Sequence, residues 1–398
     1  MISFENAYKI VLEHAFELKA EKINYLESLG RTLAEDVISD INMPPFDKSA
    51  MDGYACRSTD ISRELEQIEI IPAGRVPQKR ISADTCSKIM TGAPLPENAD
   101  TVFKIEDSQT DNNGKVFYTK FKQGETAENF IGKNICRTGE DVKIGDIVLK
   151  KGTLIKSPHL AILASAGCTE LLVFCRPQIG IIATGSELVE PHIKPENSQI
   201  RNSNASQMIT SVISAGAKPI YYGIAKDNEN DTRKLIEKSI SENEITLISG
   251  GVSAGDFDYV PKILKELNFE ILFDKVSVQP GKPVTFAKNG SKICFGVPGN
   301  PVSAFVQFEL LIRPLIRKMM FGEEIHGLTI ELETDFTRKN ADRLLWIPVK
   351  INRSGNAEPV KYNGSANINA FSQADAIMRI PEGVSKIKKG EKVYVRQI

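Results

Sequence analysis

The alternation of strand-like and helix-like segments between residues 176 and 322 restricts the fold of this 398-residue chain more than any other feature. The apolar run "QIGIIATG" ends in a glycine turn, and "SNASQMITSVISAG" then has the apolar spacing of a helix. The pattern continues through "KPIYYGIAKD", "NDTRKLIEKSIS", "EITLISGG", "DYVPKILKEL", "ICFGVPGNP" and "VSAFVQFELLIRPLIRKMM". Strands separated by helices pair in parallel, which predicts a multi-domain α/β protein with a central doubly wound, mostly parallel sheet. Such sheets bind ligands at the carboxyl ends of their strands, where the ATG, AKD, SGG and PGN turns fall.

The regions on either side predict mainly β structure. Residues 3–20 have the spacing of an amphipathic helix, but Pro44-Pro45 then ends the periodicity and marks a domain boundary. From about 65 to 150 the sequence is strand-like, and Asn113-Gly114 between two apolar runs predicts a hairpin. Period-two alternation from about 325 to 398 predicts a small β domain, a barrel or a sandwich.

Composition excludes several classes of protein. The net charge of −1 argues against nucleic-acid binding through bulk electrostatics. Six scattered cysteines without C-x-x-C and four isolated histidines argue against a structural zinc site and a disulfide framework. The N-terminal segment lacks the pattern of a signal peptide, and no apolar run approaches the roughly 18 residues of a membrane span. We therefore expect a cytoplasmic protein.

The stretch "ISGGVSAGDFDY" (248–259) has two chemical interpretations. Its G-x-S-x-G motif fits a nucleophile elbow, with Ser253 as the nucleophile of a hydrolase. Such a hydrolase needs a histidine later in the chain, and His326 is the only one. The same stretch also fits a glycine turn that binds an anion and ends in Asp256 and Asp258. A tight turn without function is the third interpretation.

The anion interpretation gains support from neighbouring turns. Gly185 and Ser186 in "ATGSEL" follow a strand, and small residues there let backbone N–H groups approach a phosphate. Lys275 and Lys282 flank "VQPG" and are suitable partners for oxyanions. The acidic residues of the same turns would repel a phosphate unless Mg²⁺ bridges them. These acidic residues are Glu187, Asp227, Asp256 and Asp258.

Some of these residues also have purely structural interpretations. Acidic residues at strand ends cap helices, which is an alternative for Asp231 and Asp256. Asn300 and Pro301 in "VPGNPVSAF" fit the N-cap and first position of a helix. "MTGAPLP" (90–96) is equally consistent with a simple Pro-Gly turn.

Taken in order, the motifs resemble those of the molybdopterin molybdenumtransferase family, which includes bacterial MoeA and the E domain of gephyrin. The resemblance covers nearly the whole chain, and the order of the motifs matches. The matching segments are "PPFDKSAMDGYA" (44–55), "IMTGAPLPENAD" (89–100), "RTGED" (137–141), "IIATGSEL" (181–188), "ISGGVSAGDFDY" (248–259), "PGKPVTF" (280–286) and "GVPGNPVSAFVQFELLIRP" (296–314).

The resemblance implies a homodimer of four-domain subunits that carries out the last step of molybdenum cofactor synthesis. Adenylylated molybdopterin binds, its link to AMP is cleaved with a divalent metal such as Mg²⁺, and molybdate is inserted. The molybdopterin adenylyltransferase is a further candidate partner, and neither nucleic acid nor membrane is expected. The implied domains are 1–44 with 142–175 (elongated), 45–141 (inserted, β-rich), 176–322 (α/β, molybdopterin-binding) and 323–398 (β-barrel-like).

Site residues follow from the resemblance by motif. Catalytic roles are implied for Asp52, Asp141, Glu187, Asp227 and Asp258, of which Glu187, Asp227 and Asp258 form the implied metal site. Substrate binding is implied for Thr91, Arg137, Thr184, Ser249, Lys275, Lys282, Pro298, Pro301 and Ser365. In the family, the β-rich domain that carries Asp52, Thr91, Arg137 and Asp141 faces the sheet domain of the other subunit.

The chain departs from the family pattern at two positions where cations are common, Gln279 and Pro348. The departures remove two charge-assisted contacts from the expected molybdate site, each worth roughly 1.5–3 kcal/mol. Arg338, Arg343 and Lys282 are the candidates to replace them. A non-catalytic scaffold that binds a pterin or a protein is the alternative that these departures favour.

Overall fold

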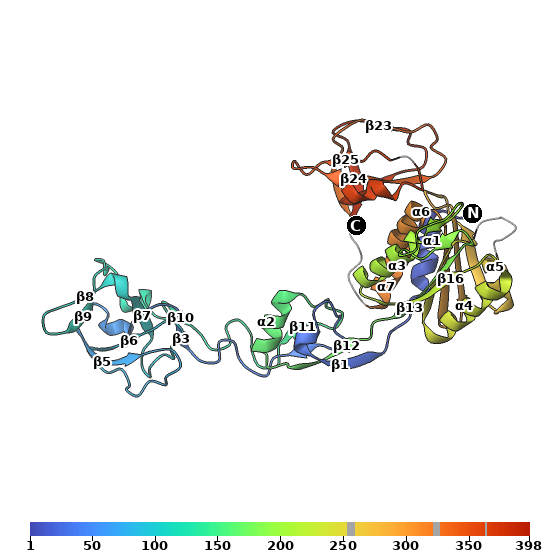
Figure 1. The fold of residues 1–398 in the computed structure, drawn as a ribbon. Helices are drawn as coiled ribbons and strands as arrows, with labels where there is room; N and C mark the ends of the chain where they lie inside the picture. Colours follow the sequence, from blue (N-terminus) through green and yellow to red (C-terminus); the bar gives the residue numbers. More distant parts are fainter. Residues whose placement is uncertain (253–258, 321–326, 363) are drawn as a thin grey trace. The chain divides into compact units, whose positions relative to one another are not determined.

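The computed structural model describes residues 1–252, 259–320, 327–362 and 364–398 (Figure 1). The chain forms two compact units. Unit 1 comprises Met1–Ala34, Gly152–Lys156 and Leu171–Ile398, and unit 2 comprises Glu35–Lys151 and Ser157–Glu170. The finer division into four domains stays a prediction.

A six-stranded sheet forms the centre of unit 1, in the order β16-β13-β17-β21-β20-β18. Strands β16, β13, β17 and β21 are parallel, whereas β20 runs antiparallel to both of its neighbours. The predicted mostly parallel sheet is therefore confirmed, with an antiparallel strand near one edge. The strands are β13 (Gln178–Thr184), β16 (Lys218–Ala225), β17 (Ile245–Ser249), β18 (Glu270–Lys275), β20 (Pro283–Asn289) and β21 (Lys292–Val297).

Helices cover both faces of this sheet, as expected for a doubly wound fold (Figure 1). Successive β13 residues point to opposite faces, so Ile181 packs in one core with α3 and α7, and Ile182 packs in another with α4 and α5. The helices are α1 (Phe4–Glu13), α3 (Ser203–Ser214), α4 (Glu229–Glu242), α5 (Val260–Glu266), α6 (Pro301–Gln307) and α7 (Arg313–Met319).

Two helices differ from the expectation. The helix expected over residues 3–20 ends at Glu13, and strand β1 (Ala20–Asn24) pairs with β12 (Glu170–Phe174). The long apolar helix after "PGN" is divided into α6 and α7 by a π-helical segment, Phe308–Ile312. Pro314 lies at the start of α7 and lacks the N–H of a regular helix, which accounts for the wider turn before it.

A second six-stranded sheet, in the order β19-β24-β26-β28-β22, with β25 beside β24, forms the C-terminal part of unit 1. It has its own core, and β19 links it to the loop before β20. The strands are β19 (Val278–Gln279), β22 (Leu328–Glu331), β24 (Leu344–Ile351), β25 (Ala357–Pro359), β26 (Ala376–Ile380) and β28 (Lys392–Gln397). A short pair, β23 (Phe336–Thr337) with β27 (Lys386–Ile387), completes this part.

Unit 2 contains a sheet in the order β7-β4-β6-β5-β9-β8 and the helix α2 (Ser157–Ser165). Its hairpin β8–β9 closes through Asn113-Gly114, as predicted, because Gly114 adopts a positive φ of 81°. The strands of the sheet are β4 (Gly53–Cys56), β5 (Leu65–Ile71), β6 (Thr85–Ile89), β7 (Thr101–Lys104), β8 (Ser108–Thr110) and β9 (Lys115–Tyr118). Two short pairs lie outside it, β3 (Lys48–Ser49) with β10 (Ile135–Cys136), and β2 (Val37–Ile38) with β11 (Ile147–Leu149).

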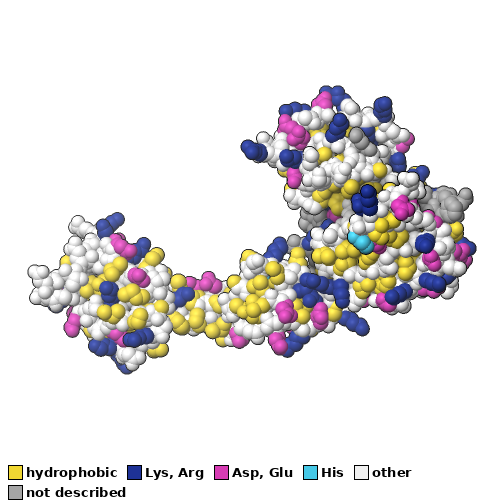
Figure 2. Space-filling view, viewed as in Figure 1, with side chains coloured by type: hydrophobic (Ala, Val, Ile, Leu, Met, Phe, Trp, Pro, Cys, Tyr) yellow, Lys and Arg dark blue, Asp and Glu magenta, His cyan; other side chains and the backbone are white. Residues whose placement is uncertain are grey.

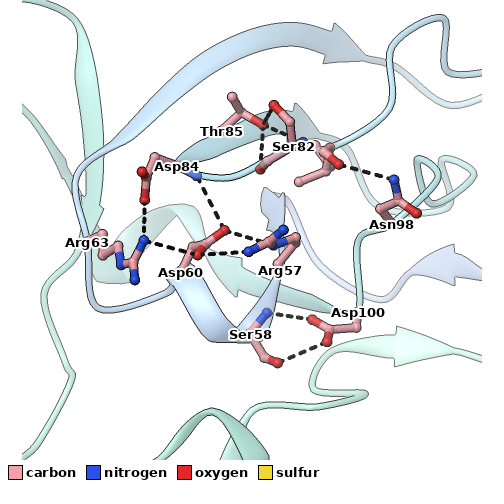
Figure 3. A network of polar contacts seen from close by, with 10 residues as sticks. Arg57, Ser58, Asp60, Arg63, Ser82, Asp84, Thr85, Asn98 and Asp100 are labelled. Atoms are coloured by element: carbon pink, nitrogen blue, oxygen red, sulfur yellow. Dashed lines mark hydrogen bonds and ion pairs between the residues drawn. The ribbon is translucent and has the colours of Figure 1, made fainter.

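A buried carboxylate fixes the loops beside this sheet (Figure 3). Asp60 is 1% exposed and forms ion pairs with Arg57 and Arg63, and Arg63 also pairs with Asp84. These contacts satisfy a charge that would be costly to bury alone.

Acidic and basic side chains are interspersed over the visible surface, in keeping with the balanced net charge (Figure 2). Among the helices of the described residues, none has the length and apolar character needed to cross a membrane.

Candidate functional site

A cavity of about 690 Å³ lies where β13, β17 and β21 end, the edge of the sheet that the sequence predicts for ligand binding. Its volume is suitable for a small organic ligand. The predicted residues Thr184, Glu187, Ser249, Pro298 and Pro301 all line it.

The glycine turn after β17 forms the floor of the cavity. Gly250 has a φ of +91°, and its N–H donates to the Val297 carbonyl at 3.0 Å. A Cβ at Gly250 would lie 2.6 Å from Thr184 Oγ1, so the ends of β13 and β17 approach as closely as they do only because residue 250 is glycine. The Thr184 hydroxyl also donates to the Ser249 carbonyl at 3.3 Å.

The turn after β13 brings two of the predicted acidic residues together. The Ser186 N–H donates to Asp227 Oδ2 at 2.8 Å, and the Asp227 N–H donates to Ser186 Oγ at 2.9 Å. A Cβ on Gly185 would lie 2.6 Å from Glu187 Oε2, which places the Glu187 carboxylate against the same turn. Two carboxylates therefore lie against the turn at the carboxyl end of β13, of which Glu187 is among the described residues that line the cavity and Asp227 is not.

The start of α3 is tied to the other strand ends through Asn204, which is 8% exposed. Its Nδ2 donates to Ser249 Oγ and to the Gly299 carbonyl, both at 2.8 Å. One amide therefore fixes α3 against the turns after β17 and β21, and this holds the cavity open in a defined shape.

The start of α6 only partly follows the structural interpretation of "PGNP". Asn300 and Pro301 occupy the N-cap and first helical positions, but the Asn300 side chain makes no capping bond. Its Nδ2 instead donates to Ser365 Oγ at 3.0 Å, and the Val302 N–H donates to the Ser365 carbonyl at 3.1 Å. Ser365 thereby joins the C-terminal part to the cavity rim, next to the lining residue Ala366.

The helix-cap interpretation of Asp231 is only partly right. The N-cap of α4 is Asn228, and Asp231 lies in the first turn of this helix and accepts a hydrogen bond from the Asn228 side chain.

Other predicted residues lie beside the cavity or outside the described residues. Lys275 and Lys282 stand at the facing ends of β18 and β20, and neither is among the lining residues, although Pro283 is. Ser253, Asp256, Asp258 and His326 lie outside the described residues. Within the described ranges, no three His, Cys, Asp or Glu side chains gather as a metal site would require.

Arg338 and Arg343, two candidates for replacing the absent cations, differ in how many hydrogen bonds their guanidinium groups already make. The Arg338 guanidinium donates to the carbonyls of Pro381, Val384 and Arg343 at 2.6–2.8 Å, so it is committed to the C-terminal fold. Burial lowers its pKa, in keeping with that role. Arg343 makes one longer bond, 3.2 Å, to the Val278 carbonyl.

The predicted residues of unit 2 form two local clusters. Asp52 Oδ1 accepts from the N–H and Oγ1 of Thr91 at 2.7 and 2.8 Å, and the backbone bond lowers the Asp52 pKa, followed by the hydroxyl. The Arg137 guanidinium donates to Asp47 at 2.6 Å. Asp141 lines a separate cavity in unit 2 of about 590 Å³, together with apolar residues such as Ile147 and Ile162.

Sequence reasoning missed Arg201, Asn202 and Asn204, which all line the main cavity. Asn202 is the N-cap of α3, and an Asn directly before the predicted helix "SNASQMITSVISAG" was the available signal for it. Arg201 and Asn204 had no comparable signal, because their relation to the cavity depends on contacts between distant segments.

Three regions of the chain match known families. Residues 2–167 match the MoeA N-terminal region (domain I and II), residues 180–318 a probable molybdopterin binding domain, and residues 329–398 the MoeA C-terminal region (domain IV). The chain is 35% identical to the molybdopterin molybdenumtransferase of Staphylococcus epidermidis, over 99% of this chain and 95% of the relative. It is 34% identical to the protein of that name from Bacillus subtilis, over 99% and 93%.

Solved structures agree with these sequence matches. The molybdopterin biosynthesis MoeA protein from Pyrococcus horikoshii superposes with a TM-score of 0.86, at 29% identity, over the whole of both chains. The fold and its cavity thus define a protein built around a molybdopterin-binding α/β domain. Within that class, the chain belongs to the MoeA family of molybdopterin molybdenumtransferases. Full-length membership decides against the serine-hydrolase interpretation of G-x-S-x-G.

Proposed function

We propose that this enzyme carries out the final step of molybdenum cofactor biosynthesis, in which molybdate is inserted into adenylylated molybdopterin and AMP is released with the help of a divalent metal. Family membership supports the enzyme class and the pathway. The observation that carries the finer proposal is the cavity at the ends of β13, β17 and β21, which Glu187 lines, with Asp227 bonded to the adjoining turn.

Mg²⁺ is the cofactor that fits the oxygen ligands at this rim. The bonds between Asp227 and Ser186 orient one carboxylate, and Glu187 lies against the same turn. We propose that Glu187, Asp227 and Asp258 hold the metal. When bound, it would neutralise charge on the phosphoanhydride and favour cleavage of the link to AMP.

The protein's own groups supply the rest of the site. The small turn at Gly250, with Thr184 and Ser249, leaves room for the pterin, and Pro298 and Pro301 shape the opposite wall. Lys275 pairs with the cavity-lining residue Pro283, which follows Lys282, and Ser365 contacts Asn300 at the cavity. We propose that Lys275, Lys282 and Ser365 bind phosphate and molybdate oxygens. Ser365 is already held by Asn300, so its position is preorganised.

The direct test mixes the purified protein with adenylylated molybdopterin, Mg²⁺ and molybdate and measures AMP release together with reconstitution of an apo-molybdoenzyme. We expect AMP release that depends on molybdate and stops when EDTA removes the metal. Tight pterin binding without AMP release would instead support the non-catalytic scaffold, which the absent cations at Gln279 and Pro348 favour.

We further propose a cytoplasmic homodimer in which Asp52, Thr91, Arg137 and Asp141 of one subunit complete the site of the other. Asp52→Asn and Asp227→Asn would then each inactivate the enzyme. If the two variants are mixed, unfolded and refolded together, mixed dimers should form and activity should return. Random pairing leaves one intact site in half of the dimers, so about a quarter of wild-type activity should return. Absence of recovery, with dimers shown by light scattering, would refute the composite site.

A further inference from the structure

A short two-stranded ribbon forms one side of the cavity. β14 (Leu188–Val189) pairs in parallel with β15 (Ile200–Arg201), and we call residues 187–202 the rim ribbon. Backbone bonds of 2.8 Å join the Ile200 N–H to the Glu187 carbonyl and the Asn202 N–H to the Val189 carbonyl. The cavity-lining residues of the rim ribbon are Glu187, Leu188, Ile200, Arg201 and Asn202.

Arg201 carries the positive charge of this wall. Glu187 and Arg201 are the two charged residues among the described lining residues. The Arg201 Nε donates to the Ile193 carbonyl at 3.2 Å. None of the described residues accepts a hydrogen bond from its terminal nitrogens, whose four N–H groups can therefore bind a ligand. A guanidinium binds two oxygens of a phosphate at once and stays charged at every working pH. The first turn of α3, which also lines the cavity, adds to the positive potential.

A single tyrosine hydroxyl ties the rim ribbon to the central sheet. Tyr221, on β16, donates to Glu190 Oε1 at 2.8 Å and accepts from Asn202 Nδ2 at 2.9 Å. Glu190 follows β14 and Asn202 follows β15, so one hydroxyl holds the ends of both ribbon strands. Burial, and then the bond to Glu190, raises the pKa of Tyr221, so the hydroxyl remains a donor at neutral pH.

The same contacts continue from Tyr221 to Arg201. The Glu190 carbonyl accepts from the Ile193 N–H at 2.9 Å, and the Ile193 carbonyl accepts from Arg201 Nε. Asn202, bonded to Tyr221, is the backbone neighbour of Arg201 and is 1% exposed. The acceptor of the Arg201 guanidinium, Ile193, and the backbone next to Arg201 are therefore both linked to Tyr221.

We propose that Arg201 binds phosphate oxygens of the pterin substrate and that Tyr221 is a positioning residue that holds Arg201 at the cavity. The inference rests on the proposed function, because it takes a phosphorylated pterin as the ligand. It also supplies a cation on the pocket wall of a chain that has Gln279 and Pro348 where cations are common.

The first experiment measures the binding of adenylylated molybdopterin by calorimetry, without molybdate. Arg201→Ala should raise Kd about 10- to 100-fold, the loss expected of a charge-assisted contact. Arg201→Lys should recover part of the affinity, because it keeps the charge but not the paired donors. Added NaCl should weaken binding more steeply in the wild type than in Arg201→Ala.

Equal Kd values for the wild type and Arg201→Ala would overturn the role of Arg201 and leave the proposed function standing. A wild type that binds no pterin would instead refute the proposed function.

The second experiment uses the neighbouring tyrosine as a matched control. Tyr222 donates to Glu242 at 2.6 Å and accepts from Asn243 Nδ2 at 2.7 Å, an arrangement like that of Tyr221 but with partners that do not line the cavity. Tyr221→Phe and Tyr222→Phe should therefore lower the melting temperature by similar amounts. Tyr221→Phe alone should raise Kd, by about 3- to 10-fold.

A double variant separates positioning from general loss of structure. If Tyr221 acts through Arg201, Tyr221→Phe combined with Arg201→Ala should bind no more weakly than Arg201→Ala alone. Additive losses in the double variant, or an equal rise of Kd in Tyr222→Phe, would overturn the positioning role.

Discussion

Carboxylates with predicted catalytic roles occur in both units, and their surroundings differ. In unit 1, Asp227 accepts a backbone N–H from the turn that carries Glu187, and Glu187 lines the 690 Å³ cavity, although Asp227 is not among its described lining residues. In unit 2, Asp141 lines a cavity of about 590 Å³, whereas Asp52 accepts from Thr91 and lines no described cavity. The contacts of Asp227 hold it at the turn beside the cavity, whereas those of Asp52 close a local turn.

A hydrogen-bonded carboxylate in a matching motif can act on a ligand only where a ligand can reach it. For Glu187 the cavity of unit 1 supplies that space. For Asp52 the proposed homodimer would have to supply it, through the sheet domain of the second subunit. The following variants distinguish a carboxylate beside the cavity of unit 1 from one that would need the second subunit. They are given in order of the expected effect on activity or stability, the largest first.

The largest effect is expected from Asp227→Asn. The amide keeps the shape and can still accept from Ser186, but it loses the charge that a metal requires, so AMP release should fall about 100-fold or more. The melting temperature should change little. Asp231→Asn is the matched control, because Asp231 exchanges hydrogen bonds with Asn228 at the start of α4 and is not among the described residues that line the cavity. Similar AMP release by the two variants would contradict the assignment of Asp227.

The next largest effect is expected from Gly250→Ala, which is compared with Gly114→Ala because both glycines have similar backbone angles. Gly250 has a φ of +91°, and a Cβ added there would lie 2.6 Å from Thr184 Oγ1. Gly114 in unit 2 has a φ of +81°, and a Cβ added there would meet no atom within 4 Å. Gly114→Ala should cost about 1 kcal/mol of unfolding free energy from backbone strain alone. Gly250→Ala should cost about 3 kcal/mol or more and also impair pterin binding, because Thr184 must move. Urea unfolding and calorimetry measure both, and equal losses would show that the close approach at Gly250 does not matter.

The fold and the floor of the site could be predicted because they depend on local patterns. Apolar periodicity located β13, β17 and α3, and glycine turns located the strand ends that form the cavity. The Asn113-Gly114 hairpin followed from backbone conformation alone.

The walls of the site could not be predicted, because they depend on pairings between distant segments. β14 and β15 have two residues each and carry no periodicity. Asn204 reaches Ser249 and Gly299, 45 and 95 residues away, and no local signal marks such a contact. The sequence predicted one regular helix where the structure has a π-helical turn at Phe308–Ile312. Pro314, which lacks an N–H, was the available signal for this interruption.

For the stability of the fold, a smaller effect is expected from Asp52→Asn, and it depends on pH. The Asp52 pKa is lowered in the folded state below its ordinary 3.8, chiefly by the Thr91 N–H. A lowered pKa adds stability above the unfolded-state pKa, and this stability is lost as the pH falls through the folded-state pKa. The melting temperature of Asp52→Asn should therefore lie below that of the wild type at pH 7 and converge with it in acid. A gap that persists at low pH would show that charge is not the cause. The composite site further predicts that this well-folded variant releases no AMP at pH 7, and full AMP release there would confine Asp52 to the turn that it closes with Thr91.

The smallest effect is expected from Arg137→Ala. Arg137 and Asp47 are 47% and 34% exposed, and an ion pair so open to solvent stabilises the fold by less than about 1 kcal/mol. The Asp47 pKa stays lowered mainly through the Thr138 N–H, which the variant retains, so unit 2 should remain folded. Thermal melting at low and high salt should show a small difference that salt removes. If Arg137 binds substrate across a dimer, Arg137→Ala will raise the KM for adenylylated molybdopterin although its stability is nearly unchanged. An unchanged KM would confine Arg137 to the turn that it closes with Asp47.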